Sequence, residues 1–150
     1  MSVEILKTLY QRELSKLKAE IAAYRDEKLL WRTEKNVPNS AGNLCLHLIG
    51  NLNAYIGVGL AGTDYVRARE LEFSLSGISK DELLEKIGET LAVVEKGLSA
   101  LSPDRLSEDF PVMIWEKPTG MEYTLVHLLT HLSYHLGQIN YHRRFFDAAG

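Results

Sequence analysis

The chain has 150 residues, of which 45% are apolar and 25% charged, and its formal net charge is −3. This length is typical of one domain, so we expect residues 1–150 to form a single domain. A mildly acidic chain without a basic cluster argues against a nucleic-acid partner. The single cysteine, Cys45, excludes an intramolecular disulfide and is typical of a cytoplasmic protein. Charges throughout the N-terminal segment exclude a signal peptide and a membrane span there, so no membrane partner is expected.

The first two helices are predicted from apolar spacing and from helix-stop signals. Apolar side chains recur every three or four positions over about residues 3–26, which is the pattern of an amphipathic helix. Pro38 cannot continue a helix, and Asn39 or Ser40 can cap the next one. We expect that second helix over about residues 41–60, where two glycines follow.

The third helix follows an unusually long connection. Residues 62–78 show no clear periodicity, and their number exceeds what two antiparallel neighbours need, which suggests a crossover along the bundle. Ser79 and Glu82 match a capping box at the start of the third helix. Apolar residues three and four apart then continue to Leu101, which is typical of a bundle seam.

The fourth helix follows a second loop. Residues 106–118 contain two prolines, and we expect a loop there with a short hairpin around residues 112–116. Thr119 and Glu122 predict another capping box, after which the helix runs to about Phe146. Four long helices with a long connection between the second and third predict an all-α fold, a four-helix bundle.

The segment "HLLTHLSYHLGQINYH", residues 127–142, holds four of the five histidines. His127, His131 and His135 are spaced one helical turn apart, so they form a stripe that borders the apolar face. Several neutral imidazoles side by side cannot easily satisfy one another, because each needs an acceptor for its N–H. One cation accepts lone pairs from all of them, and two histidines at i and i+4 are a known zinc-binding spacing.

The fifth histidine, His47, falls in the second helix and is the natural third ligand, since zinc usually takes at least three protein ligands. By spacing alone, either His127 with His131 or His131 with His135 would join it. We expect Asn43 and Asn51, one turn on either side of His47, to hydrogen-bond the far nitrogen of its ring. The alternative is a metal-free bundle in which the histidines are only packed.

Three further residues are candidates for the surroundings of this site. Gln138 is expected either to contact a metal ligand from the side that faces away from the metal or to polarise a substrate. Arg67 would receive an anionic substrate if its loop folds over the site, and otherwise lies in a solvated loop. Trp115 is either the anchor of a lid or a core residue. Cys45 is expected to be a buried thiol on another face of the second helix.

"NSAGNLCLHLIGNLNAYIG" from Asn39 and "LVHLLTHLSYHLGQI" from Leu125 resemble the DinB/YfiT-like superfamily of four-helix metal-binding bundles. The resemblance covers essentially the whole chain. It implies that His47, His131 and His135 are the metal ligands, and that His127 is a neighbour. Many members carry arginine directly after the last ligand, where this chain has Leu136. We therefore do not expect this chain to make any contact that depends on this arginine.

The resemblance also implies a function. Members bind a divalent metal, often zinc or nickel, and are frequently homodimers. Characterised ones include S-transferases that use bacillithiol and a mycothiol-dependent isomerase, although this chain looks most like members without an assigned activity. The expectation is a metal-dependent enzyme that transfers a low-molecular-weight thiol to a small-molecule substrate. The alternatives are a metal-dependent hydrolase and a non-catalytic metal-binding or dimerisation module.

Overall fold

The computed structural model describes residues 2–148, so the ends of the expected domain, residues 1, 149 and 150, lie outside the described residues. Within that range the chain is helical, and besides turns it contains only two isolated β-bridges. The all-α prediction is therefore confirmed. In chain order the elements are α1 (Val3–Ala22), η1 (Glu27–Trp31), α2 (Ala41–Leu52), η2 (Asn53–Gly57), α3 (Val58–Leu60), α4 (Arg69–Ser74), α5 (Lys80–Ser99), η3 (Pro103–Ser107) and α6 (Met121–Phe146).

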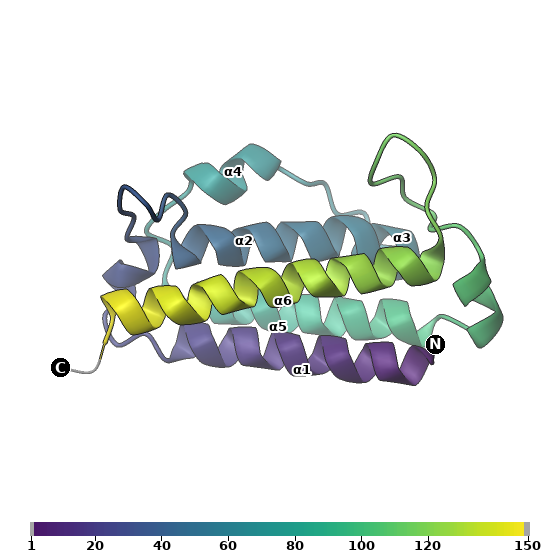
Figure 1. Cartoon of the computed structure of the whole chain (residues 1–150), viewed down its shortest axis with the longest axis horizontal. Helices are drawn as coiled ribbons and strands as arrows, with labels where there is room; N and C mark the ends of the chain where they lie inside the picture. Colours follow the sequence, from purple (N-terminus) through teal and green to yellow (C-terminus); the bar gives the residue numbers. More distant parts are fainter. Residues whose placement is uncertain (1, 149–150) are drawn as a thin grey trace.

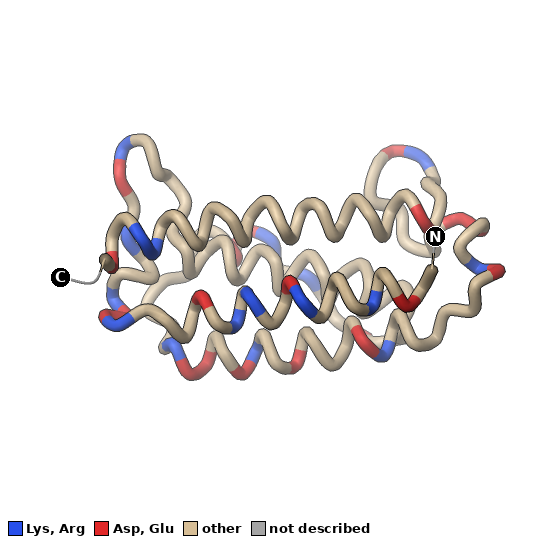
Figure 2. The backbone as a smooth tube through the Cα atoms, turned by 60° about the horizontal axis from the view of Figure 1, so that its bottom comes forward, with Lys and Arg blue, Asp and Glu red and all other residues tan. Residues whose placement is uncertain are grey.

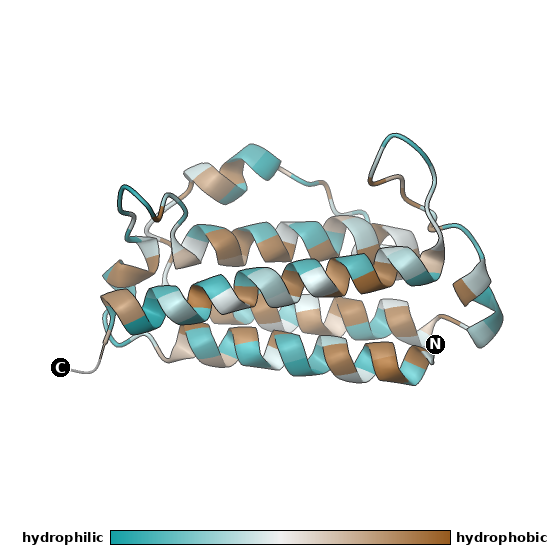
Figure 3. Cartoon of the chain, in the orientation of Figure 1, coloured by the Kyte–Doolittle hydropathy of each residue, from teal (hydrophilic) through white to brown (hydrophobic). Residues whose placement is uncertain are grey.

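Four long helical segments lie side by side (Figure 1): α1, the continuous run of α2, η2 and α3, then α5, and finally α6. The helix α1 packs against α5 and α6, and α2 packs against α5 and α6 from the other side. Hydrophobic and hydrophilic residues alternate along these helices (Figure 3), as a shared core requires. Completely buried side chains line that core, among them Leu6, Leu14, Leu48, Leu52, Ile87 and Leu132.

The short helix α4 covers the outer face of α2 (Figure 1) and belongs to the long connection between α3 and α5. With α5 and α6 on one side and α4 on the other, nearly every residue of α2 is buried. Its sequence is accordingly apolar almost all round, and His47 is only 6% exposed. The long connection between α3 and α5 thus supplies part of the cover that buries α2.

Charged residues gather on α1 and α5, whereas the middle of α6 has none (Figure 2). No Lys, Arg, Asp or Glu occurs between residues 123 and 142. Among the described helices, none combines the length and the hydropathy needed to cross a bilayer.

Several local expectations need correction. The first helix ends at Ala22 rather than near residue 26, and a separate 3₁₀ turn, η1, follows it. The second helix reaches Leu60 as expected, but its turn from Asn53 to Gly57 widens to a π-helix.

The expected hairpin over residues 112–116 is wrong, because that segment forms bends and only the loop's base is bridged, at Asp109 and Gly120. Of the predicted caps, Ser40 and Ser79 do cap α2 and α5. Thr119 does not cap α6, whose N-cap is Gly120, because its hydroxyl pairs with that of Thr124 at 2.6 Å.

Candidate metal centre

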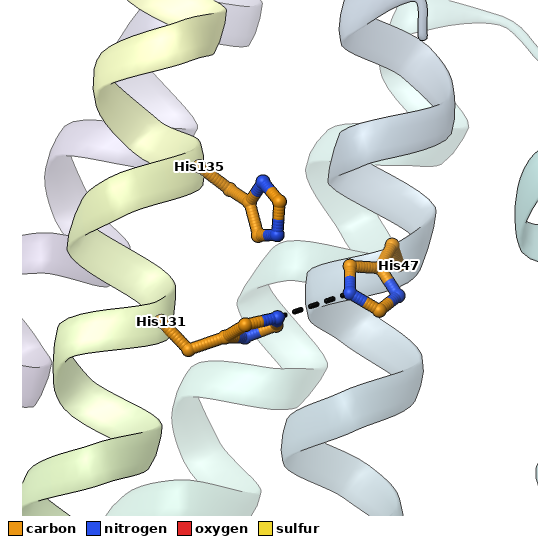
Figure 4. A group of neighbouring side chains, drawn as sticks. All are labelled: His47, His131 and His135. Carbon is orange, nitrogen blue, oxygen red and sulfur yellow. Dashed lines mark hydrogen bonds between the residues drawn. The ribbon is translucent and has the colours of Figure 1, made fainter.

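Three histidines meet between α2 and α6. His47 projects from the middle of α2, and His131 and His135 project from consecutive turns of α6, with their rings turned toward one another (Figure 4). One ring nitrogen from each lies within 4.8 Å of the others. The Nε2 atoms of His47 and His131 are 3.1 Å apart. The antiparallel packing of two helices therefore gathers residues that are 84 positions apart in the sequence.

The far side of the His47 ring is held by a carboxylate that the sequence interpretation missed. Nδ1 of His47 donates a hydrogen bond of 3.0 Å to Oε1 of Glu72, on α4. Glu72 is 6% exposed, and Arg67 donates to both of its oxygens, at 2.9 and 3.1 Å. The Phe73 ring lies beside the imidazole of His47, with the ring centroids 5.0 Å apart. The hydrogen bond to Glu72 fixes the tautomer of His47 and leaves Nε2 with its lone pair facing the other histidines.

The approach of Glu72 depends on a glycine in α2. A Cβ atom placed on Gly50 would lie 2.6 Å from Cδ of Glu72, and closer still to Oε2. Any larger residue at this position would therefore push the carboxylate away from His47. In the sequence, a glycine within the apolar α2 is the one feature that hints at a close approach by another side chain. Nothing in the local spacing connects Gly50 with Glu72, so the sequence does not identify the carboxylate.

The expectation for the two asparagines is wrong, because Glu72 takes the ring nitrogen that was assigned to them. The amide of Asn43 instead donates to the backbone carbonyls of Glu72 at 2.9 Å and Leu75 at 2.8 Å, so it ties α4 to α2. Asn51 is 7% exposed, and its Oδ1 atom has no hydrogen-bond partner among the described residues. Since it lies one turn after His47, it shares the helix face that carries the histidine.

Gln138 lies one turn after His135 and contacts its ring. Nδ1 of His135 donates to Oε1 of Gln138 at 2.7 Å, which leaves Nε2 of His135 with its lone pair. For His131 the arrangement differs, because its Nδ1 atom is buried without a hydrogen-bond partner in the described part of the chain. Its Nε2 atom shares a hydrogen bond of 3.1 Å with Nε2 of His47, and the tautomer of His131 with its proton on Nδ1 would free Nε2 for a metal.

The environment favours uncharged imidazoles. Burial, together with the neighbouring His135 and His47, lowers the pKa of His131 to about 4. Burial also lowers the pKa of His47, although the hydrogen bond and charge of Glu72 oppose this shift. Both rings are therefore neutral near pH 7 and offer lone pairs, the form in which histidine binds a metal.

The remaining candidates lie around this group. His127 is outside the cluster and packs edge-on against Trp115, with ring centroids 4.7 Å apart. Trp115 itself is 38% exposed, so it covers His127 and is not a core residue. Arg67 does reach the site, but it pairs with Glu72, so its guanidinium is engaged by a carboxylate of the chain itself. Cys45 is fully buried, and burial raises the pKa of its thiol to about 12.

The donor set fits a divalent ion. Two nitrogens that bind one zinc ion at its usual distances, in tetrahedral geometry, lie about 3.3 Å apart. The 3.1 Å between the Nε2 atoms of His47 and His131 is close to this value, and the third nitrogen lies within 4.8 Å. His47 and His135 already donate their other N–H to an oxygen, as histidine ligands of metals usually do.

Fold and site define the class of this protein as an all-α chain with a group of three histidines between two packed helices. Over residues 3–149 the chain matches the family described as "Protein of unknown function (DUF1572)", and it belongs to that family. No curated protein matches the chain.

Proposed function

We propose that the protein is a divalent-metal protein of the DinB/YfiT-like four-helix-bundle type, with His47, His131 and His135 as its ligands. The observation that carries the proposal is the convergence of three ring nitrogens within 4.8 Å. It is supported by the outward hydrogen bonds of His47 and His135, which direct the lone pairs of both rings inward. Zinc and nickel are the expected ions, since imidazole suits both.

The ligand count points to an enzyme. Structural zinc sites almost always have four protein ligands, whereas catalytic sites have three and keep one position for water or substrate. When bound by three neutral imidazoles, a divalent ion retains its full charge and deprotonates a coordinated thiol. The buried acceptor Oδ1 of Asn51, without a partner among the described residues, lies on the same face of α2 and suits a hydrogen bond from a molecule bound there.

The activity that we propose is transfer of a low-molecular-weight thiol to a small electrophile. The thiol sulfur forms a bond to the electrophilic carbon, the leaving group departs with the bonding electron pair, and the thiol proton passes to solvent. Glu72 and Gln138 keep the rings of His47 and His135 oriented throughout, because each accepts the N–H that faces away from the other histidines. A homodimer, expected from the family resemblance, is part of the same proposal.

A cobalt-substituted sample tests this function. Thiolate ligation adds an intense sulfur-to-metal charge-transfer band in the near ultraviolet, so bacillithiol, coenzyme A, cysteine and glutathione are added in turn to wild type and to His135→Ala. The proposal predicts the band with at least one thiol in wild type and with none in the variant. Silence with all four thiols, on protein that holds stoichiometric cobalt, would refute thiol transfer and leave a hydrolase or a non-catalytic module.

A further inference from the structure

A groove opens toward the C-terminal end of α6, beginning at Gln138, one turn after His135. It has a volume of about 410 Å³ and lies between residues 36–39, the first turn of α2 and the last turns of α6. Its lining is mainly apolar, with Val37, Pro38, Leu44, Tyr141, Phe145 and Phe146. This volume is within the range of small-molecule sites, which is roughly 300–1,000 Å³.

One residue, Gln138, connects the groove with the histidines. Gln138 lines the groove, and its Oε1 atom accepts the hydrogen bond from Nδ1 of His135. Leu44, on the opposite wall, precedes His47 by three residues and therefore lies on the adjacent turn of α2. A molecule in the groove thus has one end against a side chain that contacts a proposed metal ligand.

The lining offers no charge to a ligand. None of the residues that line the groove is Lys, Arg, Asp or Glu. His142, at its base, is 4% exposed and has both nitrogens engaged: Nδ1 accepts from the hydroxyl of Tyr24 at 2.6 Å, and Nε2 donates to the carbonyl of Arg32 at 2.8 Å. Burial lowers the pKa of His142, so the ring is neutral. The lining side chains therefore offer an ion no opposite charge, and the nearby Arg32 and Arg144 stack on the rings of Phe146 and Tyr141.

The rim exposes large aromatic surface. Tyr141 is 71% exposed and Phe145 is 82% exposed, and both lie in the last turns of α6, where the guanidinium of Arg144 stacks on the ring of Tyr141 at 5.2 Å. Covering these rings with an apolar ligand removes their surface from water, which supplies the driving force for binding.

We propose that this groove binds an uncharged apolar group, an aryl or alkyl tail of the substrate, and directs the other end of that molecule past Gln138 toward the histidines. The second half of this inference rests on the proposed metal function, whereas binding of the tail does not. A second copy of the chain is the competing occupant of the exposed rings. The continuity of the groove with His135 through Gln138 favours the small molecule.

Binding of the tail is tested with N-phenyl-1-naphthylamine, a neutral apolar dye that fluoresces when it leaves water. The metal-free wild-type chain should bind it saturably with one dye per chain, and Phe145→Ser should weaken binding by about tenfold or more. Val37→Arg, which places a charge in the groove, should have at least the same effect. Tyr123→Ser is the matched control, because Tyr123 is 64% exposed on the same helix but does not line the groove.

Three results would overturn the groove as a ligand site: no saturable dye binding, equal weakening by Tyr123→Ser, or a Phe145→Ser chain that changes only its oligomeric state. Because Phe145 and Tyr123 are exposed, both substitutions should leave the fold intact, so a difference in dye binding reports on the groove.

The direction of the ligand is tested with 4-fluorobiphenyl, whose ¹⁹F relaxation is compared in the cobalt-loaded and zinc-loaded protein. Cobalt is paramagnetic, so relaxation should be enhanced in the cobalt form, and Phe145→Ser should remove the enhancement. Dye binding without enhancement, on protein that holds stoichiometric cobalt, would refute the link to the histidines. If the chain holds no cobalt, the proposed metal function fails while dye binding still decides the groove.

Discussion

Replacing Gly50 with alanine should weaken metal binding without a change at any proposed ligand. The new Cβ would lie 2.6 Å from Cδ of Glu72, whereas ordinary contact begins at 3.4 Å, so the carboxylate must retreat by at least about 0.8 Å. Glu72 is buried and held by Arg67 and His47, and it cannot move without breaking these bonds. His47 would then lose the acceptor that fixes its tautomer.

The expected magnitude follows from the role of such acceptors. Loss of a partner that orients a histidine ligand typically lowers metal affinity about 10–100-fold, which corresponds to roughly 1.4–2.8 kcal/mol. Affinity is measured by competition with a fluorescent zinc chelator, on protein without a histidine tag. Gly88→Ala is the control, because among the described residues a Cβ at Gly88 has only Nζ of Lys18 within 4 Å, at 3.8 Å.

A double-mutant cycle separates this mechanism from general distortion. If Gly50→Ala acts through the carboxylate, then Glu72→Ala and the double variant Gly50→Ala/Glu72→Ala should have the same zinc affinity. Gly50→Ala protein that is folded by circular dichroism and binds zinc as tightly as wild type would refute the role of Glu72. Additive losses in the double variant would show that Gly50 acts by another route.

Further predictions concern stability and pH. Burial lowers the pKa of His131, to about 4, and also that of His47. Zinc affinity should therefore hold from pH 8 to 6.5 and decline only at a pH below the ordinary imidazole pKa; a midpoint above pH 7 would contradict this. Zinc at a hundred times its dissociation constant should stabilise the fold by about 2.7 kcal/mol and raise Tm by roughly 5–10 °C in calorimetry; an unchanged Tm would count against the site. Arg67→Met should cost about 3–5 kcal/mol in urea unfolding, since it leaves the buried charge of Glu72 without its cation, and Arg67→Met/Glu72→Gln should recover part of that loss.

The long helices were predictable because each carries a strong periodic signal. The seam of α5 follows the capping residue Ser79, and α1 repeats buried apolar or aromatic residues every three or four positions from Leu6 to Ile21. Their apolar faces alone determine that they pack against one another. The histidine spacing on α6 likewise placed His131 and His135 on one face, because an α-helix has 3.6 residues per turn and residues four apart lie above one another.

The role of Glu72 was not predictable in the same way. It lies in α4, a helix of six residues that is too short to show a period and was expected to be part of a loop. Its burial depends on contacts with α2, namely the bond to His47 and the space above Gly50. Asn43 was misassigned for the same reason, since its partners are carbonyls of the segment that α4 brings over α2. Such contacts arise from tertiary packing and leave no local pattern.

The most direct measurement is the metal content of protein purified without a histidine tag and reconstituted with zinc or nickel, determined by elemental analysis. We expect one ion per chain in wild type and in His127→Ala, because His127 packs against Trp115 outside the cluster. We expect loss of the ion in His47→Ala, His131→Ala and His135→Ala, since two histidines rarely retain such a metal. A wild-type chain that holds no stoichiometric metal, or a His127→Ala chain that loses its metal while His135→Ala retains it, would contradict the account.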